Sequence, residues 1–207
     1  MTSQTIVKME GISKAFAGIK ALDNVQIDLR QGEIHALMGE NGAGKSTLMK
    51  IMTGVYSRDS GKMYLQNALS NQLEEVEIKS PLAAQKLGLS MVFQEFNLLE
   101  NMNIAENIFI GREPLGAGQT VDKKQLIQNA AVELKKVNLD IDPSTEVSKL
   151  SCGQKQCVEI AKALSFNARV VVFDEPTASL SERESQTLFK LIKELKEKGV
   201  CIVYISH

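Results

Sequence analysis

The chain has 207 residues, of which 43% are hydrophobic and 24% are charged. This length suits one domain, with room for a subdomain and a sizeable buried core. The formal net charge of −1 excludes a chain-wide basic field of the kind that attracts nucleic acid. The three cysteines, Cys152, Cys157 and Cys201, have neither the spacing of a zinc site nor the even number of a disulfide framework. We therefore expect reduced thiols in a cytosolic compartment.

The two ends of the chain carry information of different kinds. The first residues lack the apolar segment of a secretory signal, and no stretch has the uninterrupted apolar length that crosses a bilayer. Any membrane role is therefore expected to depend on a partner. The chain stops at His207, immediately after an expected core strand, which predicts a fragment of a longer protein.

Short apolar runs occupy the first part of the chain. Between about residues 6 and 34 they are split by Gly11, Gly18 and Gly32, which predicts strands joined by turns. Residues 34–38 (IHALM) form an apolar run that ends in glycine. This run predicts a fully buried strand.

A helix, a loop, a second helix and a strand are expected next. Residues 46–52 predict a helix with Gly54 as its stop signal. Residues 67–80 are polar and acidic, which predicts an exposed hairpin or loop. A short helix is predicted over 81–88, with proline at its start, and a strand over 89–93.

The middle of the chain, from about residue 101 to residue 165, is expected to be mostly helical, with a connecting loop near residue 140. A helix over 151–164 gathers four side chains on one face: Cys157, Ile160, Ala161 and Leu164.

The last part alternates strand, helix and strand. Residues 169–174 (RVVVFD) predict a buried parallel strand, and 200–205 predict another. Ser181 and Glu184 have the spacing of a capping box, and Gly199 ends the helix that follows. That helix places four apolar residues on one stripe: Leu188, Leu191, Ile192 and Leu195. The alternation predicts a parallel α/β core.

A phosphate-binding loop is the most specific local motif. Residues 39–47 (GENGAGKST) fit the Walker A pattern G-x-x-x-x-G-K-[ST], between an expected strand and an expected helix. Glycines let backbone N–H groups point at phosphate oxygens, and the helix N-terminus favours anions. Lys45 would contact the β- and γ-phosphates, and the Ser46 hydroxyl would face Mg²⁺. The candidate nucleotide-binding residues here are Gly39, Asn41, Gly42, Ala43, Gly44, Lys45, Ser46 and Thr47.

Two acidic residues end the strand over residues 170–174. Asp174 can hold Mg²⁺, usually through water, and Glu175 can orient and polarise an attacking water. An ordinary apolar strand that ends in a solvated turn can also be followed by two acids. The presence of Lys45 and Ser46 in the same chain favours a Walker B strand instead.

Further motifs follow in a fixed order. Residues 150–154 (LSCGQ) are similar to the LSGGQ signature of ABC ATPases. Gln94 matches the Q-loop glutamine, residues 178–181 match the D-loop, and His207 matches the switch histidine. Phe16 matches the aromatic residue that stacks on adenine, with a core aromatic as the alternative. The chain therefore resembles the ABC ATPase family over nearly its whole length.

The resemblance implies an α/β fold of the P-loop NTPase (RecA-like) type. It has a parallel core, an N-terminal antiparallel β subdomain and a helical signature subdomain, here cut at the C-terminal end. Residues 1–207 would form one ABC nucleotide-binding domain with a helical subdomain at about 96–165. ATP and Mg²⁺ are the implied cofactors.

The resemblance also implies three groups of functional residues. The catalytic residues would be Glu175, His207 and Lys45. The metal-site residues would be Ser46, Gln94 and Asp174. The residues acting on a nucleotide held by the opposite domain would be Ser151, Gly153 and Gln154.

Several stretches resemble importers of the ribose and galactose kind: residues 19–25, 36–44, 94–99, 158–164 and 175–180. This implies an ATP-driven importer of a monosaccharide and a match to the first of two ATPase halves. Implied partners are a second nucleotide-binding domain, in the same chain or a dimer mate, permease subunits and, indirectly, a periplasmic sugar-binding protein. No nucleic acid is expected, and the implied location is peripheral, at the cytoplasmic face of the inner membrane.

Departures from the family pattern leave alternatives open. Cys152 stands where the family often has glycine, and Ser181 where many members have aspartate. A soluble ABC-type ATPase without a permease, such as a ribosome-associated translation factor, is the first alternative. A chromosome or DNA-repair ATPase is disfavoured because sustained heptads are absent. A non-hydrolysing regulator is disfavoured by Glu175 and His207.

Overall fold

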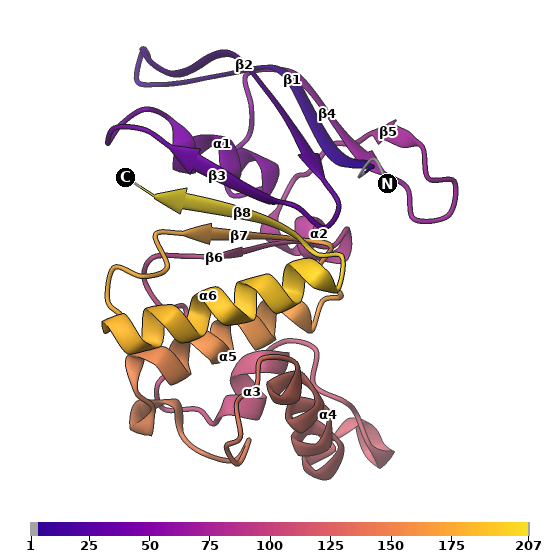
Figure 1. Cartoon of the computed structure of the whole chain (residues 1–207). Coiled ribbons are helices and arrows are strands. Elements are labelled where there is room, and N and C mark those ends of the chain that lie inside the picture. The colour runs from indigo at the N-terminus through magenta and orange to yellow at the C-terminus, as the bar shows by residue number, and fades with distance from the viewer. Residues whose placement is uncertain (1–3, 207) are drawn as a thin grey trace. The chain divides into compact units, whose positions relative to one another are not determined.

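The computed structural model describes residues 4–206 (Figure 1). Its strands are β1 (Thr5–Phe16), β2 (Ile19–Arg30), β3 (Ile34–Met38), β4 (Ser60–Gln66), β5 (Leu73–Glu75), β6 (Leu89–Val92), β7 (Val170–Asp174) and β8 (Cys201–Ser206). Its α-helices are α1 (Lys45–Met52), α2 (Pro81–Lys86), α3 (Ile104–Phe109), α4 (Lys123–Lys136), α5 (Cys152–Leu164) and α6 (Glu182–Glu197). Short 3-10 turns cover Ala117–Gln119 and Val147–Lys149.

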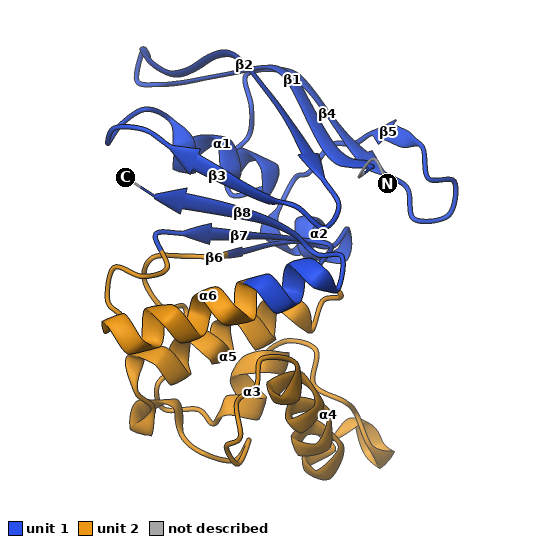
Figure 2. Ribbon diagram, in the orientation of Figure 1, with its two compact units in different colours: residues 1–91, 168–175, 193–207 blue, residues 92–167, 176–192 orange. Residues whose placement is uncertain are grey.

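The chain divides into two compact units (Figure 2). The first comprises residues 1–91, 168–175 and 193–207, and the second comprises residues 92–167 and 176–192. The first contains nearly all of the strands, whereas the second contains α3, α4, α5 and most of α6.

The first unit contains two four-stranded sheets. One has the order β2-β1-β4-β5, and its neighbouring strands are antiparallel. The other has the order β3-β8-β7-β6, and β8 pairs in parallel with both β3 and β7. The prediction of a parallel α/β core with an N-terminal antiparallel sheet is therefore confirmed.

One hydrophobic core joins both sheets to α1 inside this unit. It is formed by apolar side chains of β1, α1, β7 and β8, among them Ile6, Met9, Leu48, Met52, Val170, Val172, Val203 and Ile205. Every residue of β7 is buried, as its β-branched run predicts. The phosphate loop that precedes α1 thus leads into a helix that is packed in this core.

Two local predictions in this unit are wrong. β3 is not fully buried, because it hydrogen-bonds β8 on one side only, and Met38 is 71% exposed. Gly11 does not end a strand: it lies within β1, with φ 66°, where the pairing with β2 is irregular between Met9 and Ile12. A glycine accommodates that left-handed backbone, so the strand continues through a local distortion.

The second unit is built on contacts among α3, α4 and α5. Asn103 and Glu106 form a capping box at the start of α3, and Asp122 caps α4. Inward-facing residues of these helices are fully or nearly fully buried, among them Ile104, Ile108, Leu126, Ala130, Leu134 and Ile160. The helical prediction fails between α3 and α4, where glycine and proline residues leave only one 3-10 turn.

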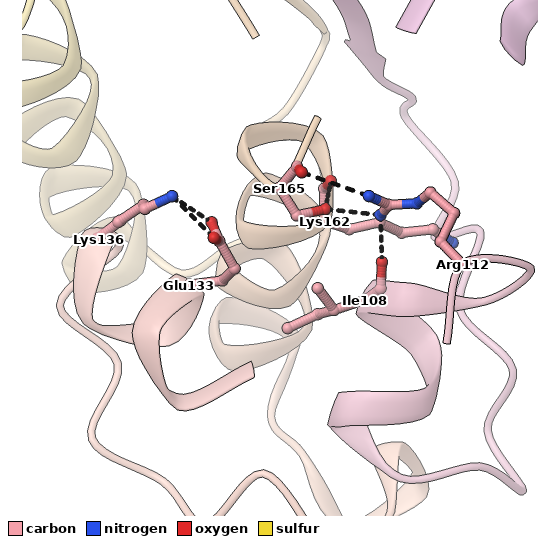
Figure 3. A network of polar contacts seen from close by, with 6 residues as sticks. All are labelled: Ile108, Arg112, Glu133, Lys136, Lys162 and Ser165. Carbon is pink, nitrogen blue, oxygen red and sulfur yellow. Dashed lines mark hydrogen bonds and ion pairs between the residues drawn. The ribbon is translucent and has the colours of Figure 1, made fainter. Parts of the chain in front are cut away.

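Arg112 ties the C-terminal end of α3 to that of α5 (Figure 3). Its Nη2 atom donates to Ile108 O and to Ser165 Oγ, both at 2.8 Å, and Nη1 donates to Ser165 O at 3.3 Å. The guanidinium carbon lies 3.5 Å from the centre of the Phe166 ring. Burial lowers the pKa of Arg112. The planar guanidinium thus makes hydrogen bonds with its edge and stacks on an aromatic ring with its face.

Replacing Arg112 with methionine is expected to lower the free energy of unfolding by about 2 kcal/mol, because it removes three hydrogen bonds from a charged donor. Urea unfolding would measure the loss. Lys149→Met, which breaks an exposed pair with Glu146, is the control and should change stability by less than about 1 kcal/mol. Equal losses in the two variants would contradict the role of Arg112.

Candidate functional site

The loop before α1 has a cradle-like backbone. Gly42 and Gly44 adopt left-handed conformations, with φ 83° and 86°. A Cβ atom at Gly44 would lie 2.5 Å from Ala21 O, so no other residue fits there without displacing the backbone. The sequence prediction that this loop depends on its glycines is supported at this position.

The Lys45 side chain folds back onto the first residues of the loop. It is buried, and Nζ donates to Gly39 O at 2.5 Å and to Glu40 O at 3.0 Å. The ammonium group therefore lies within the turn of the loop, close to the helix N-terminus. A positive charge in this position is suited to phosphate oxygens.

A cavity of about 150 Å³ opens at this loop. It is lined by Ala21, Asn41, Gly42, Ala43, Gly44, Lys45, Ser46, Thr47 and Glu175. Thus the loop and the residue after β7, which are far apart in the sequence, share one cavity.

Ser46 and Asp174 meet directly. Ser46 Oγ donates to Asp174 Oδ1 at 2.9 Å, and Asp174 is buried at the carboxyl end of β7. Hydroxyl and carboxylate oxygens are suitable ligands for Mg²⁺, together with waters and substrate phosphates. Within residues 4–206, no group of three or more His, Cys, Asp or Glu side chains is arranged to hold a metal. The pair fits a sparsely ligated magnesium ion of the kind that binds with a nucleotide.

Glu175 has an unusual backbone. Its φ is 48°, a left-handed conformation that costs a non-glycine residue about 1–3 kcal/mol. Its N–H donates to Ile205 O at 3.2 Å, which holds the strained turn against β8. The conformation presents Glu175 at the cavity, and no sequence pattern predicted this strain.

Phe16 lies at the end of β1 and is 40% exposed, so the alternative that it is a core aromatic is wrong. Its ring centre lies 5.2 Å from that of Tyr56 in an edge-on arrangement, and Lys14 Nζ lies 5.5 Å from it. Sequence reasoning missed Tyr56, because the pairing joins β1 to the segment after α1.

In the second unit, residues 151–154 begin α5 with a capping box. Ser151 Oγ accepts from Gln154 N at 3.3 Å, and Gln154 Oε1 accepts from Ser151 N at 2.8 Å. Gly153 N donates to Glu184 at 2.9 Å. Cys152 is exposed, whereas burial raises the pKa of Cys157 to about 11.

The predicted site residues are distributed over both units of the chain. The structure brings together the loop, Lys45, Ser46, Asp174 and Glu175 within the first unit. Gln94 is an exposed residue of the second unit, in the bend after β6. His207 lies outside the described residues.

The segment after Gln94 is held to α5. The buried carboxylate of Glu159 accepts a hydrogen bond from Asn97 N, and Lys162 Nζ donates to Asn97 O at 3.2 Å. Burial raises the pKa of Glu159, and the nearby Lys162 and the Asn97 N–H offset only part of this rise.

Replacing Glu159 with glutamine is expected to flatten the dependence of stability on pH. Native Glu159 holds its proton more tightly than the unfolded chain does, so its contribution to the free energy of unfolding falls as pH rises through the ordinary and then the raised pKa. Glutamine cannot ionise, so E159Q should gain stability relative to the unmodified chain as pH rises through this range. Urea unfolding at a series of pH values measures the difference. Parallel pH curves for the two proteins would contradict it.

Comparison with known proteins places these features in context. A sequence model described as ABC transporter matches residues 22–178, more than half of the chain. The chain is 50% identical over 207 residues to a putative ribose/galactose/methyl galactoside import ATP-binding protein 2 of Burkholderia cenocepacia. It is 47% identical over 204 residues to the ribose import ATP-binding protein RbsA of Clostridium perfringens. These matches cover 100% and 98% of this chain but 39% of each relative, so the chain spans about two-fifths of their length.

Solved structures agree with this placement. A crystal structure of a nucleotide-free ATP-binding cassette from an ABC transporter has a TM-score of 0.84 and 29% identity, covering 99% of this chain and 82% of that one. A dimeric cassette in a post-hydrolysis state, bound to ADP and Pi, has a TM-score of 0.75 and 27% identity, covering 98% and 88% of the two chains. No helix within residues 4–206 has the length and hydropathy of a transmembrane span. By its sequence and its fold, the chain belongs to the ABC transporter family.

Proposed function

We propose that residues 1–207 form an ATP-binding and ATP-hydrolysing domain that drives the import of a monosaccharide. One observation carries the ATPase proposal: Ser46 Oγ bonds Asp174 Oδ1 at 2.9 Å, beside a cavity lined by the phosphate loop and Glu175. The importer proposal is supported by relatives whose names include ribose and galactose import. These comparisons give no support to the alternative of an ABC-type ATPase without a permease.

The loop residues Gly39, Asn41, Gly42, Ala43, Gly44 and Thr47 would surround the phosphates, together with Lys45 and Ser46. Lys45 would exchange the carbonyls of Gly39 and Glu40 for phosphate oxygens, which are stronger acceptors. Phe16, exposed beside Tyr56, would stack on adenine. ATP thus extends from the aromatic pair into the cradle.

Ser46 and Asp174 would hold Mg²⁺, with Gln94 as a third residue of the metal site. When bound, the ion neutralises charge on the phosphate oxygens. Glu175 would accept a hydrogen bond from the attacking water and direct it at the γ-phosphate. His207 would contact the γ-phosphate and help to distinguish ATP from ADP.

We further propose that Ser151, Gly153 and Gln154 act on a nucleotide held by a second nucleotide-binding domain, in the same full-length chain or in a dimer mate. The dimeric cassette among the solved structures supports this arrangement. Residues 1–207 would then be one nucleotide-binding domain, with a helical subdomain at about 96–165. Permease subunits would dock on that subdomain, where Leu99 is 50% exposed. The domain would lie at the cytoplasmic face of the inner membrane, coupled indirectly to a periplasmic sugar-binding protein.

Disruption of the encoding gene is the test of the importer proposal. Uptake of radiolabelled monosaccharides, including ribose and galactose, should fall for at least one sugar. The intact gene should restore it, and a Lys45→Ala gene should not. Unchanged uptake of every monosaccharide in the panel would overturn the import proposal, while phosphate release by the purified protein tests the ATPase proposal separately.

A further inference from the structure

Glu184, in the first turn of α6, hydrogen-bonds both to Ser181 just before its own helix and to the N-terminal end of α5. One carboxylate oxygen, Oε2, accepts from Ser181 Oγ at 2.7 Å and from Ser181 N at 3.0 Å. The other oxygen, Oε1, accepts from Gly153 N at 2.9 Å and more weakly from Ser151 Oγ at 3.4 Å. The capping-box prediction for Ser181 and Glu184 is confirmed, but the second pair of contacts was not foreseen.

The carboxylate lies directly against Gly153. A Cβ atom built on Gly153 would lie 2.6 Å from Glu184 Oε1 and 2.8 Å from its Cγ, so the glycine makes room for this side chain. Gly153 N–H belongs to the first turn of α5, where backbone donors have no partner within the helix. Its hydrogen bond therefore goes to Glu184.

Bonds from Ser181 and Gly153 lower the pKa of Glu184, so it carries a full negative charge at neutral pH. The charge faces the first turn of α5, which favours an anion. Glu184 thus supplies, from within the chain, the kind of group that a phosphate would supply from outside.

Ser151 and Gly153, whose hydroxyl and N–H groups bond Glu184, are two of the three residues that the proposed function assigns to a nucleotide on a second domain. An N–H group makes one strong hydrogen bond at a time, and two anions at one place repel each other. We propose that the Glu184 carboxylate competes with this nucleotide for these two donors, so that the γ-phosphate must displace it before the two domains close. Glu184 then sets the ATP concentration at which closure occurs. This inference rests on the proposed function.

Replacing Glu184 with glutamine tests the competition. An amide has only one acceptor oxygen, and Ser181 offers the two stronger donors, so the oxygen should stay with Ser181 and leave the Gly153 N–H free. The variant also removes the negative charge. Closure should therefore need on the order of tenfold less ATP, because the competing state loses a hydrogen bond to a charged group.

Cys152 provides the readout, because it is exposed beside Gly153, whereas Cys157 is half-buried and Cys201 is buried. The rate of Cys152 alkylation by a maleimide would be followed by mass spectrometry against ATP concentration. The full-length protein would carry Glu175→Gln so that ATP is retained. Protection of Cys152 should begin at lower ATP in the E184Q variant. Glu182→Gln, an exposed acid on the same helix, is the matched control and should not shift the midpoint.

The possible outcomes test the competition by Glu184 separately from the proposed function of the chain. An unchanged or higher ATP midpoint in E184Q overturns the competition, since a purely structural cap could only weaken closure when it is lost. Thermal unfolding of both variants shows whether the cap on α6 was affected. If ATP binds but protects Cys152 in none of the variants, the proposed closure onto a second domain is wrong, and the competition by Glu184 is wrong as well. If ATP does not bind at all, the proposed function itself is wrong.

Discussion

Replacing Glu175 with glutamine is expected to reduce ATP hydrolysis by about 10²- to 10⁴-fold, the usual contribution of a general base, while ATP binding persists. The amide keeps the size of the side chain but cannot take a proton from water. Lys45 and the loop are unchanged, so the cradle should still hold the phosphates. Phosphate release would measure hydrolysis, and a fluorescent ATP analogue would measure binding.

The backbone of Glu175 sharpens this experiment. Glutamine is strained at φ 48° as glutamate is, so E175Q should not gain stability. Glu175→Gly should relieve the strain, yet be equally inactive. Glu77→Gln, an exposed acid in the same unit, is the control and should keep full hydrolysis. Hydrolysis that survives in E175Q would remove Glu175 from the role of base.

Replacing Lys45 with alanine is expected to weaken ATP binding on the order of 100-fold, which corresponds to about 3 kcal/mol. Among the described residues that line the cavity, Lys45 is the only lysine or arginine, and its loss leaves the carbonyls of Gly39 and Glu40 without this donor. Titration with the fluorescent analogue would measure the dissociation constant.

The matched control for Lys45→Ala is Lys62→Ala, which breaks an exposed pair with Glu75 and should leave ATP binding unchanged. Urea unfolding of both variants separates a loss of binding from a loss of folding. ATP affinity within about threefold of the unmodified chain would contradict a phosphate role for Lys45.

The local parts of the fold follow from local patterns. The phosphate loop, the buried strand β7 and the cap on α6 each depend on residues that are neighbours in the sequence, so spacing alone predicts them. The exposure of β3 depends on which strand lies beside it, and strand order is a property of the whole sheet. A single sequence read segment by segment does not contain that information.

The candidate site divides in the same way. The sequence predicted Ser46 and Asp174, and the structure adds that their side chains touch. The sequence did not predict that Tyr56 lies beside Phe16 or that Glu184 bonds Gly153, because these contacts join separate elements. The strain at Glu175 is also hidden, since most residues that adopt a positive φ are glycines.

The position of β8 between β3 and β7 has a consequence for biosynthesis. Ile34 pairs with Ile202, and Ser46 bonds a carboxylate 128 positions further along the chain. The β1–β2 hairpin can form as soon as it leaves the ribosome, but the parallel sheet cannot be assembled until β8, which ends at Ser206, has been translated. Nascent chains should therefore remain unable to retain ATP, and should depend on chaperones, until synthesis passes β8.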